Sequence, residues 1–378
     1  MGDPIDLDRL AAELARPGDG GSNAGETRLD DWLRLVADRS ASDLLLLAGE
    51  PPALRIEGRI ERVSAGPVDG SEVEDAVLPA LPPHAQRAYR ETGIGDGSRR
   101  IAGVGRFRIN LHRERGRPAA AIRMLPKHVP TLAELRLPPG TERLVRLSRG
   151  LVLVGGATGS GKTTTVAALV REISEREARH IITIEDPIEY EHVNSRSVIQ
   201  QVEVGIDAPS FQAALRSALR QAPDVIVVGE MRDPETMQIA LAAGETGHLV
   251  LSTLHTTDVA STIARMTDSF PIERQPTIRQ EIAAALAAVY VQTLLPARSG
   301  ARVPAAELLM VSYGGRQHIR RNALQHLHQE ITITRKNGSF TLEECLARLV
   351  GSGIVERAEA ALRAGHLEDF EHALGQGR

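Results

Sequence analysis

The feature that most constrains this chain is a short glycine-rich segment that lies between a buried strand and a helix in the expected order. The segment reads Gly156-Ala157-Thr158-Gly159-Ser160-Gly161-Lys162-Thr163 and matches the pattern G-x-x-x-x-G-K-[ST] without a gap. It follows the apolar run Gly150–Val154 and precedes Thr164–Ile173, which has helical character. Glycines let several backbone N–H groups turn toward an anion, and the following helix begins with the positive end of its dipole there. The segment therefore predicts a phosphate-binding loop.

The residue types in this loop indicate which phosphates it holds. Lys162 is expected to reach the β and γ oxygens of a nucleoside triphosphate, and the Thr163 hydroxyl to ligate Mg²⁺. The chain has only three lysines, Lys127, Lys162 and Lys336, and nearly all its other basic residues are arginines. A lysine at position 162 therefore indicates that the loop needs a compact ammonium rather than a guanidinium. The expected cofactors are thus ATP and Mg²⁺. The expected binding residues are Gly156, Ala157, Thr158, Gly159, Ser160, Gly161, Lys162, Thr163 and Thr164.

The rest of the second half alternates short apolar runs with helical stretches. The runs are Leu151–Val154, Ile181–Ile184, Val225–Val228 and Leu249–Leu251. Continuous apolar strands of this length are typical of a buried parallel sheet, and the alternation indicates an α/β layered domain. A capping pattern at Asp233-Pro234 predicts a helix that ends near Gly244, and Thr341 with Glu344 has capping-box spacing.

Acidic residues follow the second and third of these runs. Glu185, Asp186 and Glu189 lie just past the carboxyl end of a strand, where open α/β sheets bind ligands. Glu230 closes the third run, and because Gly229 occupies the usual aspartate position, Glu230 is the best candidate for the catalytic base. Glu185 is the second candidate, and either could hold Mg²⁺ through water. The alternatives are an ordinary acidic loop and a helix-capping or ion-paired glutamate.

His255 follows the fourth run and precedes two threonines. It is a candidate sensor of the γ-phosphate through hydrogen bonding, although a single histidine is more often structural.

The span from residue 99 to 123 holds eight arginines. Arg106–Leu111 alternates polar and apolar residues as a half-buried strand does, and Ala120–Met124 is expected to be its return strand. A turn near Arg115-Gly116 would bring Arg108 opposite Arg123. Two such guanidiniums beside a phosphate site are typical of arginine fingers. The alternatives are a nucleic-acid-binding surface and a solvated basic edge strand.

Bulk properties limit the class of protein. The net charge of −4 over 378 residues does not favour a generic polyanion binder. One cysteine, Cys345, excludes an internal disulfide and a four-cysteine zinc site, and fits a reduced, cytoplasmic compartment. No apolar stretch reaches the roughly 20 residues of a membrane span, and the start of the chain lacks a signal-peptide pattern. We therefore expect membrane association only through partners.

Composition shifts predict four parts of the chain. Residues 1–27 are expected to hold a short helix and a Gly/Ser-rich flexible tail, and residues 28–126 a mixed domain. Residues 127–140 are proline-rich and are expected to be a linker. Residues 141–378 are expected to be the α/β domain with a helical C-terminal region.

Together these residues resemble a known family. Gly156–Thr163, Ile184–Glu189, Val228–Asp233 and Glu245–Thr257 resemble, in order, the Walker A, Asp, Walker B and His boxes of secretion-superfamily ATPases. Within that superfamily the chain is most similar to the twitching-motility ATPases that retract type IV pili. Ser42–Gly58 resembles the start of that family's PAS-like N-terminal domain.

The resemblance implies an α/β, RecA-like P-loop ATPase domain with a smaller α+β PAS-like N-terminal domain. It implies a homohexameric ring with ATP between the two domains and Arg108 and Arg123 completing the site. Turnover would drive pilin removal through an inner-membrane platform protein, with a possible ATPase paralogue as a partner and no nucleic acid. Two places depart from the family pattern: Leu45 replaces a histidine, and Gly314–Arg321 replaces the retraction subfamily's usual segment.

Other functions stay open at this stage. They are an accessory paralogue in the same machine, a pilus-assembly or type II secretion motor, a nucleic-acid translocase that uses the arginine hairpin, and a non-hydrolysing ATP-binding regulatory subunit. A single cysteine does not favour assembly motors, which often carry a four-cysteine zinc insert.

Overall fold

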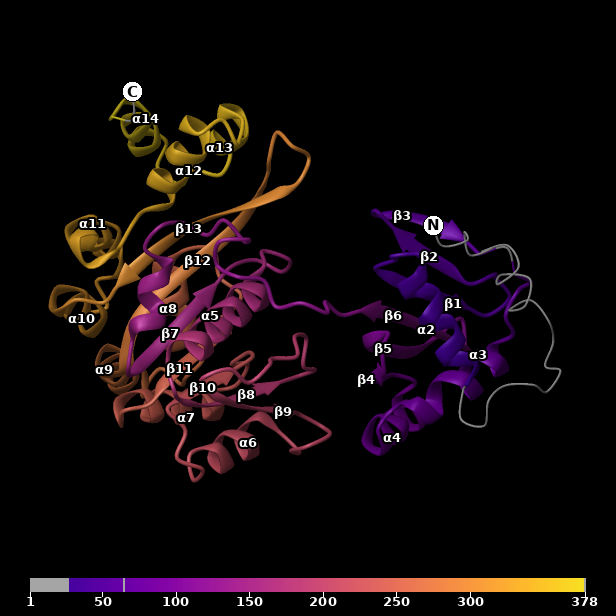
Figure 1. The fold of residues 1–378 in the computed structure, drawn as a ribbon. Coiled ribbons are helices and arrows are strands. Elements are labelled where there is room, and N and C mark those ends of the chain that lie inside the picture. The colour runs from indigo at the N-terminus through magenta and orange to yellow at the C-terminus, as the bar shows by residue number, and fades with distance from the viewer. Residues whose placement is uncertain (1–26, 64, 377–378) are drawn as a thin grey trace. The chain divides into compact units, whose positions relative to one another are not determined.

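The chain folds into two compact units, residues 1–128 and 129–378, shown in Figure 1. The computed structural model describes residues 27–63 and 65–376. The short helix and flexible tail predicted for residues 1–27 lie outside the described residues, which begin at Thr27. Each unit is described by itself.

The first unit is an antiparallel sheet with helices packed on it, which confirms the α+β prediction. The sheet has six strands in the order β3-β2-β1-β6-β5-β4. Its elements are α2 (Arg28–Asp38), β1 (Asp43–Leu47), β2 (Ala53–Ile56), β3 (Arg59–Arg62), α3 (Gly70–Val77), η1 (Leu78–Ala80), α4 (Pro83–Thr92), β4 (Gly95–Ile101), β5 (Gly105–Glu114) and β6 (Arg117–Met124).

Local sequence signals explain two of these elements. A capping box at the start of α2 joins Thr27 and Asp30, and the helix buries Trp32 and Leu33 against the sheet. The predicted hairpin is confirmed: β5 and β6 pair antiparallel, with Arg108 opposite Arg123. Arg115 has a φ of 50°, and Gly116 has the left-handed φ of 77° that such a tight turn favours.

The second unit is built on a seven-stranded sheet of order β13-β12-β7-β11-β10-β8-β9. All neighbouring pairs are parallel except β12 with β13. Its elements are η2 (Thr141–Arg146), β7 (Gly150–Gly155), α5 (Lys162–Arg176), β8 (His180–Glu185), β9 (Val198–Glu203), α6 (Phe211–Ala218), β10 (Val225–Val228), α7 (Pro234–Glu245), β11 (Leu249–Leu254), α8 (Val259–Asp268), α9 (Gln275–Ala285), β12 (Leu286–Pro296), β13 (Arg302–Met310), α10 (Tyr313–Arg320), η3 (Leu324–His326), α11 (Leu327–Ile333), η4 (Thr334–Asn337), α12 (Leu342–Gly351), α13 (Arg357–Ala361) and α14 (Leu367–Gln376).

Helices cover both faces of this sheet, so its central strands are apolar throughout. In β7, Leu151 and Leu153 face the core that includes α7, α8 and α9, whereas Val152 and Val154 face the core that includes α5. The four predicted runs are the strands β7, β8, β10 and β11, which confirms the α/β prediction. Helix α7 ends at Glu245, next to the expected Gly244, and the capping box of Thr341 and Glu344 begins α12.

Three strands of the second unit were not predicted from the sequence. β9 lies at one edge of the sheet, and β12 and β13 form a hairpin in which β12 pairs in parallel with β7. The β12 segment continues without a break from the alanine-rich end of α9, and its apolar run shows no alternation, so periodicity alone does not distinguish it from a helix.

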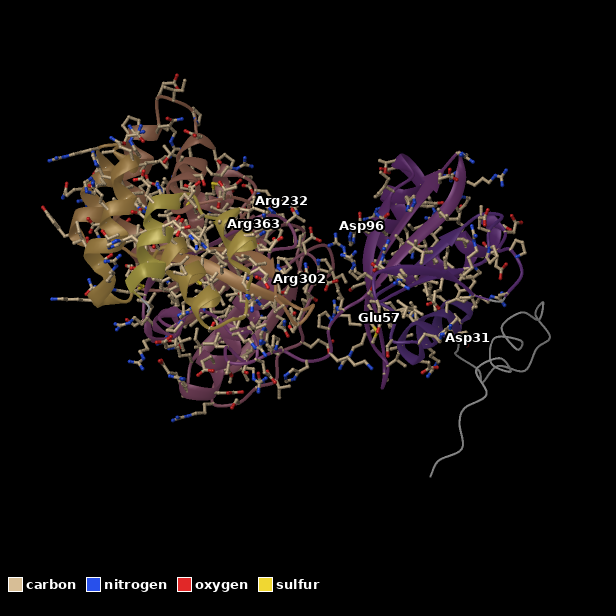
Figure 2. All side chains as sticks on the ribbon, turned by 90° about the horizontal axis from the view of Figure 1, so that it is seen from above. Asp31, Glu57, Asp96, Arg232, Arg302 and Arg363 are labelled. Atoms are coloured by element: carbon tan, nitrogen blue, oxygen red, sulfur yellow. The ribbon has the colours of Figure 1, made fainter. Side chains whose placement is uncertain are left out.

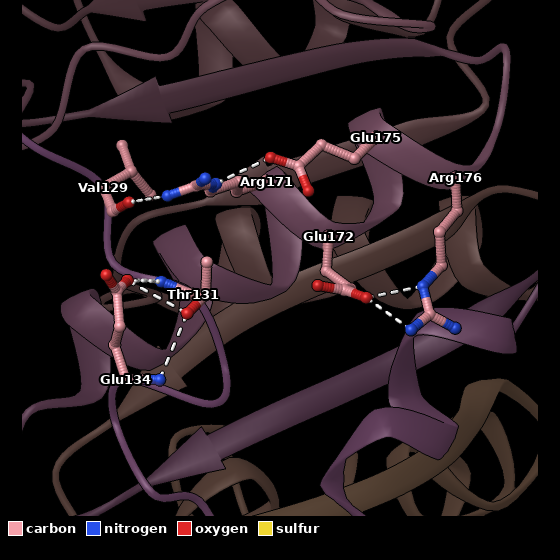
Figure 3. Close-up of polar contacts among 7 residues, drawn as sticks. All are labelled: Val129, Thr131, Glu134, Arg171, Glu172, Glu175 and Arg176. Atoms are coloured by element: carbon pink, nitrogen blue, oxygen red, sulfur yellow. Dashed lines mark hydrogen bonds and ion pairs between the residues drawn. The ribbon is translucent and has the colours of Figure 1, made fainter.

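The segment that leads into the second unit contacts the outer surface of α5. Residues 125–140 contain neither helix nor strand, and the assignment of 127–140 as a linker stays a prediction. Arg171 donates to the Val129 carbonyl at 2.5 Å and to Glu175 at 2.8 Å, as Figure 3 shows. Thr131 and Glu134 cap each other across three residues. The hydrogen bond from Arg171 to Val129 attaches the start of the second unit to α5, the helix that follows the glycine-rich loop.

Candidate functional site

The glycine-rich loop lies between β7 and α5, as predicted. Gly156, Gly159 and Gly161 have φ values of 151°, 77° and 88°, conformations that other residues rarely adopt. A Cβ on Gly161 would lie 2.9 Å from the Gln292 amide nitrogen. Helix α5 begins at Lys162, so the loop leads directly to its N-terminus. The loop therefore has the shape and the dipole that a phosphate requires.

Lys162 is buried, and its ammonium folds back over the loop. It donates to the carbonyls of Gly156 at 2.8 Å and Ala157 at 3.0 Å. Burial lowers the pKa of Lys162, while the charges of Glu230 and Glu189 act in the opposite direction. The ammonium therefore lies at the phosphate loop with two carboxylates close enough to influence its charge.

Glu230 and His255 join Lys162 in one cluster. The His255 Nδ1 atom lies 3.4 Å from the Lys162 ammonium, and its Nε2 atom lies 3.5 Å from a Glu230 oxygen. Because an ammonium can only donate, Nδ1 accepts and the ring proton of a neutral His255 is on Nε2, facing Glu230. The other Glu230 oxygen accepts from Arg232 at 2.9 Å, an exposed side chain labelled in Figure 2. The structure thus brings together three of the residues predicted from separate boxes.

Glu185 occupies a different environment, although it ends a neighbouring strand. One of its oxygens accepts from the Thr183 hydroxyl at 2.7 Å and from the Gln201 amide at 3.3 Å. Burial raises the pKa of Glu185, and these two hydrogen bonds partly offset that rise. Glu185 is held inside a polar network, whereas Glu230 is connected to Lys162 by His255, which contacts both.

The two threonines after the lysine lie in the first turn of α5. Thr163 is half-buried, and the Thr164 hydroxyl lies 3.0 Å from the Tyr190 hydroxyl. Thr158, also in the loop, lies 3.3 Å from the His255 Nδ1 atom. The Ser160 hydroxyl is buried and has no hydrogen-bond partner within residues 27–63 and 65–376.

Gln292 is a site residue that the sequence analysis missed. It is 4% exposed, and its amide nitrogen donates to the Ser160 carbonyl at 2.6 Å. Its carbonyl oxygen accepts from the Thr165 hydroxyl in α5 at 2.7 Å. One side chain therefore joins the loop to its helix. A buried amide side chain in the largely apolar strand Ala288–Leu295 was the available signal, but only the pairing of β12 with β7 places it beside the loop.

The two predicted arginines belong to the first unit and differ from each other. Arg108 is exposed. Arg123 donates to Asp43 at 2.8 Å, and Asp43 also lies 3.5 Å from Arg55. Burial acts to raise the pKa of Asp43, but the hydrogen bonds from Arg123 and Ser42 and the charges of Arg123 and Arg55 together outweigh it, and the pKa is lowered. Asp43 therefore stays ionised and orients the Arg123 guanidinium.

The residues present fit a nucleotide with Mg²⁺. The loop presents its glycine backbone, the Lys162 ammonium and the α5 N-terminus, which together suit phosphate. The Thr163 hydroxyl and the Glu230 carboxylate are oxygen ligands of the kind that Mg²⁺ prefers, directly or through water.

Comparisons with known proteins identify the family. The model of the family described as "Type II/IV secretion system protein" matches residues 120–357. The chain belongs to this family. It is 39% identical over 342 residues to the type IV pilus retraction ATPase PilT of Pseudomonas aeruginosa, a match that covers 90% of this chain and 99% of that protein. It is also 34% identical over 346 residues to the type IV pilus ATPase PilU of the same organism, covering 91% of each.

A solved structure supports the same family relationship. The crystal structure of the pilus retraction motor PilT with bound ADP matches with a TM-score of 0.81 at 39% identity, covering 90% of this chain and 98% of that one. The resemblance inferred from the four boxes is therefore confirmed, and so is the fold class. This secretion-family chain is a homologue of pilus retraction ATPases. Across the described residues, no helix is both long and apolar enough to cross a membrane.

Proposed function

We propose that this protein hydrolyses ATP and that turnover drives type IV pilus retraction. The observation that carries the ATPase assignment is the cluster of Lys162, His255 and Glu230 at the glycine-rich loop. A phosphate-binding loop needs a cation for the phosphates and a nearby acid for the attacking water, and this cluster supplies both. The relatives named PilT and PilU support the pilus assignment.

Each residue has a role in this proposal. The backbone of residues 156–164 and the Lys162 ammonium hold the phosphates, and Thr163 ligates Mg²⁺. Glu230 takes the proton of the attacking water, with His255 linking it to Lys162. The contacts among Lys162, His255 and Glu230 keep these groups oriented, which lowers the cost of reorganisation during the reaction. Bound Mg²⁺ would neutralise charge on the phosphates.

Glu185 is the second candidate for the base or for a water-mediated Mg²⁺ ligand. Its three acceptor contacts favour a supporting role, because its hydrogen bonds to Thr183, Gln201 and the Glu189 backbone already use its oxygens. Glu230 has a single neighbouring arginine and an oxygen that faces His255.

Arg108 and Arg123 complete the catalytic set in our proposal. We assign nucleotide binding to residues 141–378 and the two arginines to the domain of residues 28–126. Their guanidiniums would stabilise charge that develops on the phosphates in the transition state. Arg123 is supported in this role by Asp43, which holds it in place at 2.8 Å.

We further propose a homohexamer that acts at the inner face of the cell membrane through a platform protein of the pilus machine. Heterologous contacts that close on themselves make a ring, and a ring couples successive hydrolysis events. A ring of this kind predicts that turnover per chain rises with protein concentration. Sedimentation with and without nucleotide measures the oligomeric state directly.

An activity assay combined with a deletion strain tests the proposal. Purified wild-type protein should hydrolyse ATP, Lys162→Ala should abolish hydrolysis, and Lys336→Ala, which removes an exposed lysine, should leave it unchanged. The deletion strain should keep or gain surface pili and lose twitching, and only a gene with intact Lys162 should restore motility. Hydrolysis that persists in Lys162→Ala would contradict the ATPase assignment. A strain without pili would indicate an assembly motor, and unchanged motility an accessory paralogue.

A further inference from the structure

Two histidines and one aspartate converge near the C-terminus, away from the glycine-rich loop in the sequence. His328 lies in α11, His366 directly precedes α14, and Asp369 lies in the first turn of α14. Their ligand-type atoms all lie within 4.8 Å of one another. The His328 Nε2 atom is 3.1 Å from an Asp369 oxygen, and the rings of His328 and His366 have centroids 4.2 Å apart.

The backbone that carries His366 is fixed by a buried acid. Glu343 of α12 is 2% exposed, and one of its oxygens accepts from the backbone N–H groups of Gly365 at 3.1 Å and His366 at 3.0 Å. Phe370, next to Asp369, is fully buried in the core beneath α14. The turn is therefore anchored on both sides, while the side chains of His366 and Asp369 extend into solvent.

We propose that His328, His366 and Asp369 bind one divalent transition-metal ion of the class that imidazole prefers, such as Zn²⁺ or Co²⁺. A tetrahedral zinc ion with ligands at about 2.0–2.2 Å holds its ligand atoms roughly 3.4 Å apart. The His328 and Asp369 atoms already match that spacing at 3.1 Å. A rotation of the exposed His366 side chain closes the third position.

The fourth position is left for water or for His372. His372 is exposed and lies three residues after Asp369 on α14, so both face the same side of the helix. Three protein ligands with one open position are a common zinc arrangement.

A simple surface ion pair accounts for less of this geometry. A hydrogen bond from His328 to Asp369 explains two of the three residues, but it does not require a second imidazole beside the first. Neither does it require the Glu343 contacts that hold the His366 backbone. Nitrogen ligands also separate this site from the proposed nucleotide Mg²⁺ site, because Mg²⁺ prefers oxygen ligands.

A bound ion would join α11 to α14. Helix α11 follows α10, and α10 contains most of Gly314–Arg321, the segment that departs from the retraction subfamily. The ion would therefore stabilise the C-terminal helices around this segment. It would raise the unfolding temperature according to its occupancy, since it binds the folded chain in preference to the unfolded one.

Metal titration of the full-length protein tests the site. Tag-free protein without nucleotide is titrated with Zn²⁺ by calorimetry and with Co²⁺ by visible absorption, and the unfolding temperature is followed with and without Zn²⁺. We expect one ion per chain and a higher unfolding temperature. Zinc binding should weaken by at least about tenfold in each of three variants, His328→Ala, His366→Gln and Asp369→Asn. Loss of a group that only hydrogen-bonds to a metal ligand already costs about tenfold or more in affinity, so loss of a ligand itself should cost at least as much.

Two variants serve as controls. Glu368→Ala removes an exposed acid beside Asp369, and His84→Ala removes an exposed histidine in α4, so both should bind as the wild type does. His366→Gln changes only an exposed side chain, which keeps the test valid if His328→Ala fails to fold. No binding by the wild type would overturn the proposal. Binding that persists in a His328→Ala, His366→Gln double variant would overturn it as well.

Discussion

Replacing Gln292 by leucine should disorder the phosphate loop without touching a predicted catalytic residue. Gln292 is the only described side chain that hydrogen-bonds both the Ser160 carbonyl and the Thr165 hydroxyl. Leucine has a similar volume but leaves both groups unsatisfied in a buried setting. Each unsatisfied group costs about 1–3 kcal/mol, so the summed loss is about 2–6 kcal/mol, and local relaxation toward solvent favours the lower half of that range.

Two measurements follow from this magnitude. Thermal unfolding should shift down by about 4–16 °C, since a loss of about 2–4 kcal/mol applies and each kcal/mol corresponds to about 2–4 °C in a unit of this size. If nucleotide must supply the free energy that orders the loop, a cost of 1.4 kcal/mol raises KM for ATP about tenfold. We therefore expect KM to rise by at least about tenfold, with a smaller fall in kcat.

Matched variants separate the two hydrogen bonds of Gln292. Thr165→Val removes only the bond to α5 and should cause roughly half of the stability loss. Gln292→Glu keeps the acceptor for Thr165 but places an oxygen against the Ser160 carbonyl, so it should impair nucleotide binding more than Thr165→Val does. Because both positions share one network, the double variant should lose less than the sum of the single losses. Wild-type KM and an unfolding temperature within about 1 °C in Gln292→Leu would refute the reasoning.

Three further predictions concern single groups. Glu230→Gln keeps the shape but removes the base, so nucleotide affinity should stay near normal while hydrolysis falls at least about 10²-fold; full turnover would move the base elsewhere. Removing either guanidinium, in Arg108→Ala or Arg123→Ala, should lower kcat more than ATP affinity, because arginine fingers act on charge that develops in the transition state. Intact turnover with lost DNA affinity would instead favour nucleic-acid binding. Burial raises the pKa of Glu307 to about 7, although it accepts from the Val259 N–H at 2.6 Å. Since the unfolded carboxyl ionises near pH 4.3, stability should fall as pH rises from about 4 to 7. In Glu307→Gln, the free energy of unfolding measured in urea should depend less on pH over this range. An unchanged pH dependence would show that other groups cause it.

Several features of this protein were predictable because their signals are local in the sequence. The spacing from Gly156 to Thr163 specifies a loop conformation over eight residues, and the apolar runs specify buried strands through their own composition. The capping box at Thr341 and the hairpin register of Arg108 with Arg123 likewise depend on neighbouring residues or on one turn.

The site could be predicted only in part. Lys162, Glu230 and His255 were identifiable one by one, because each follows a strand whose carboxyl end lies at the same edge of a parallel sheet. Their mutual contacts, and the tautomer of His255 that these contacts require, depend on side-chain positions that no local pattern specifies.

The sequence alone determined the phosphate loop, the apolar central strands and the family of this protein, because each of these depends on residue types at short, fixed spacing. Only the tertiary structure decided that β12 pairs with β7, that Gln292 therefore holds the loop, and that His328 meets His366 and Asp369. These contacts join residues far apart in the chain. They form through strand order and helix packing, which result from burying the whole apolar surface at once rather than from any single segment.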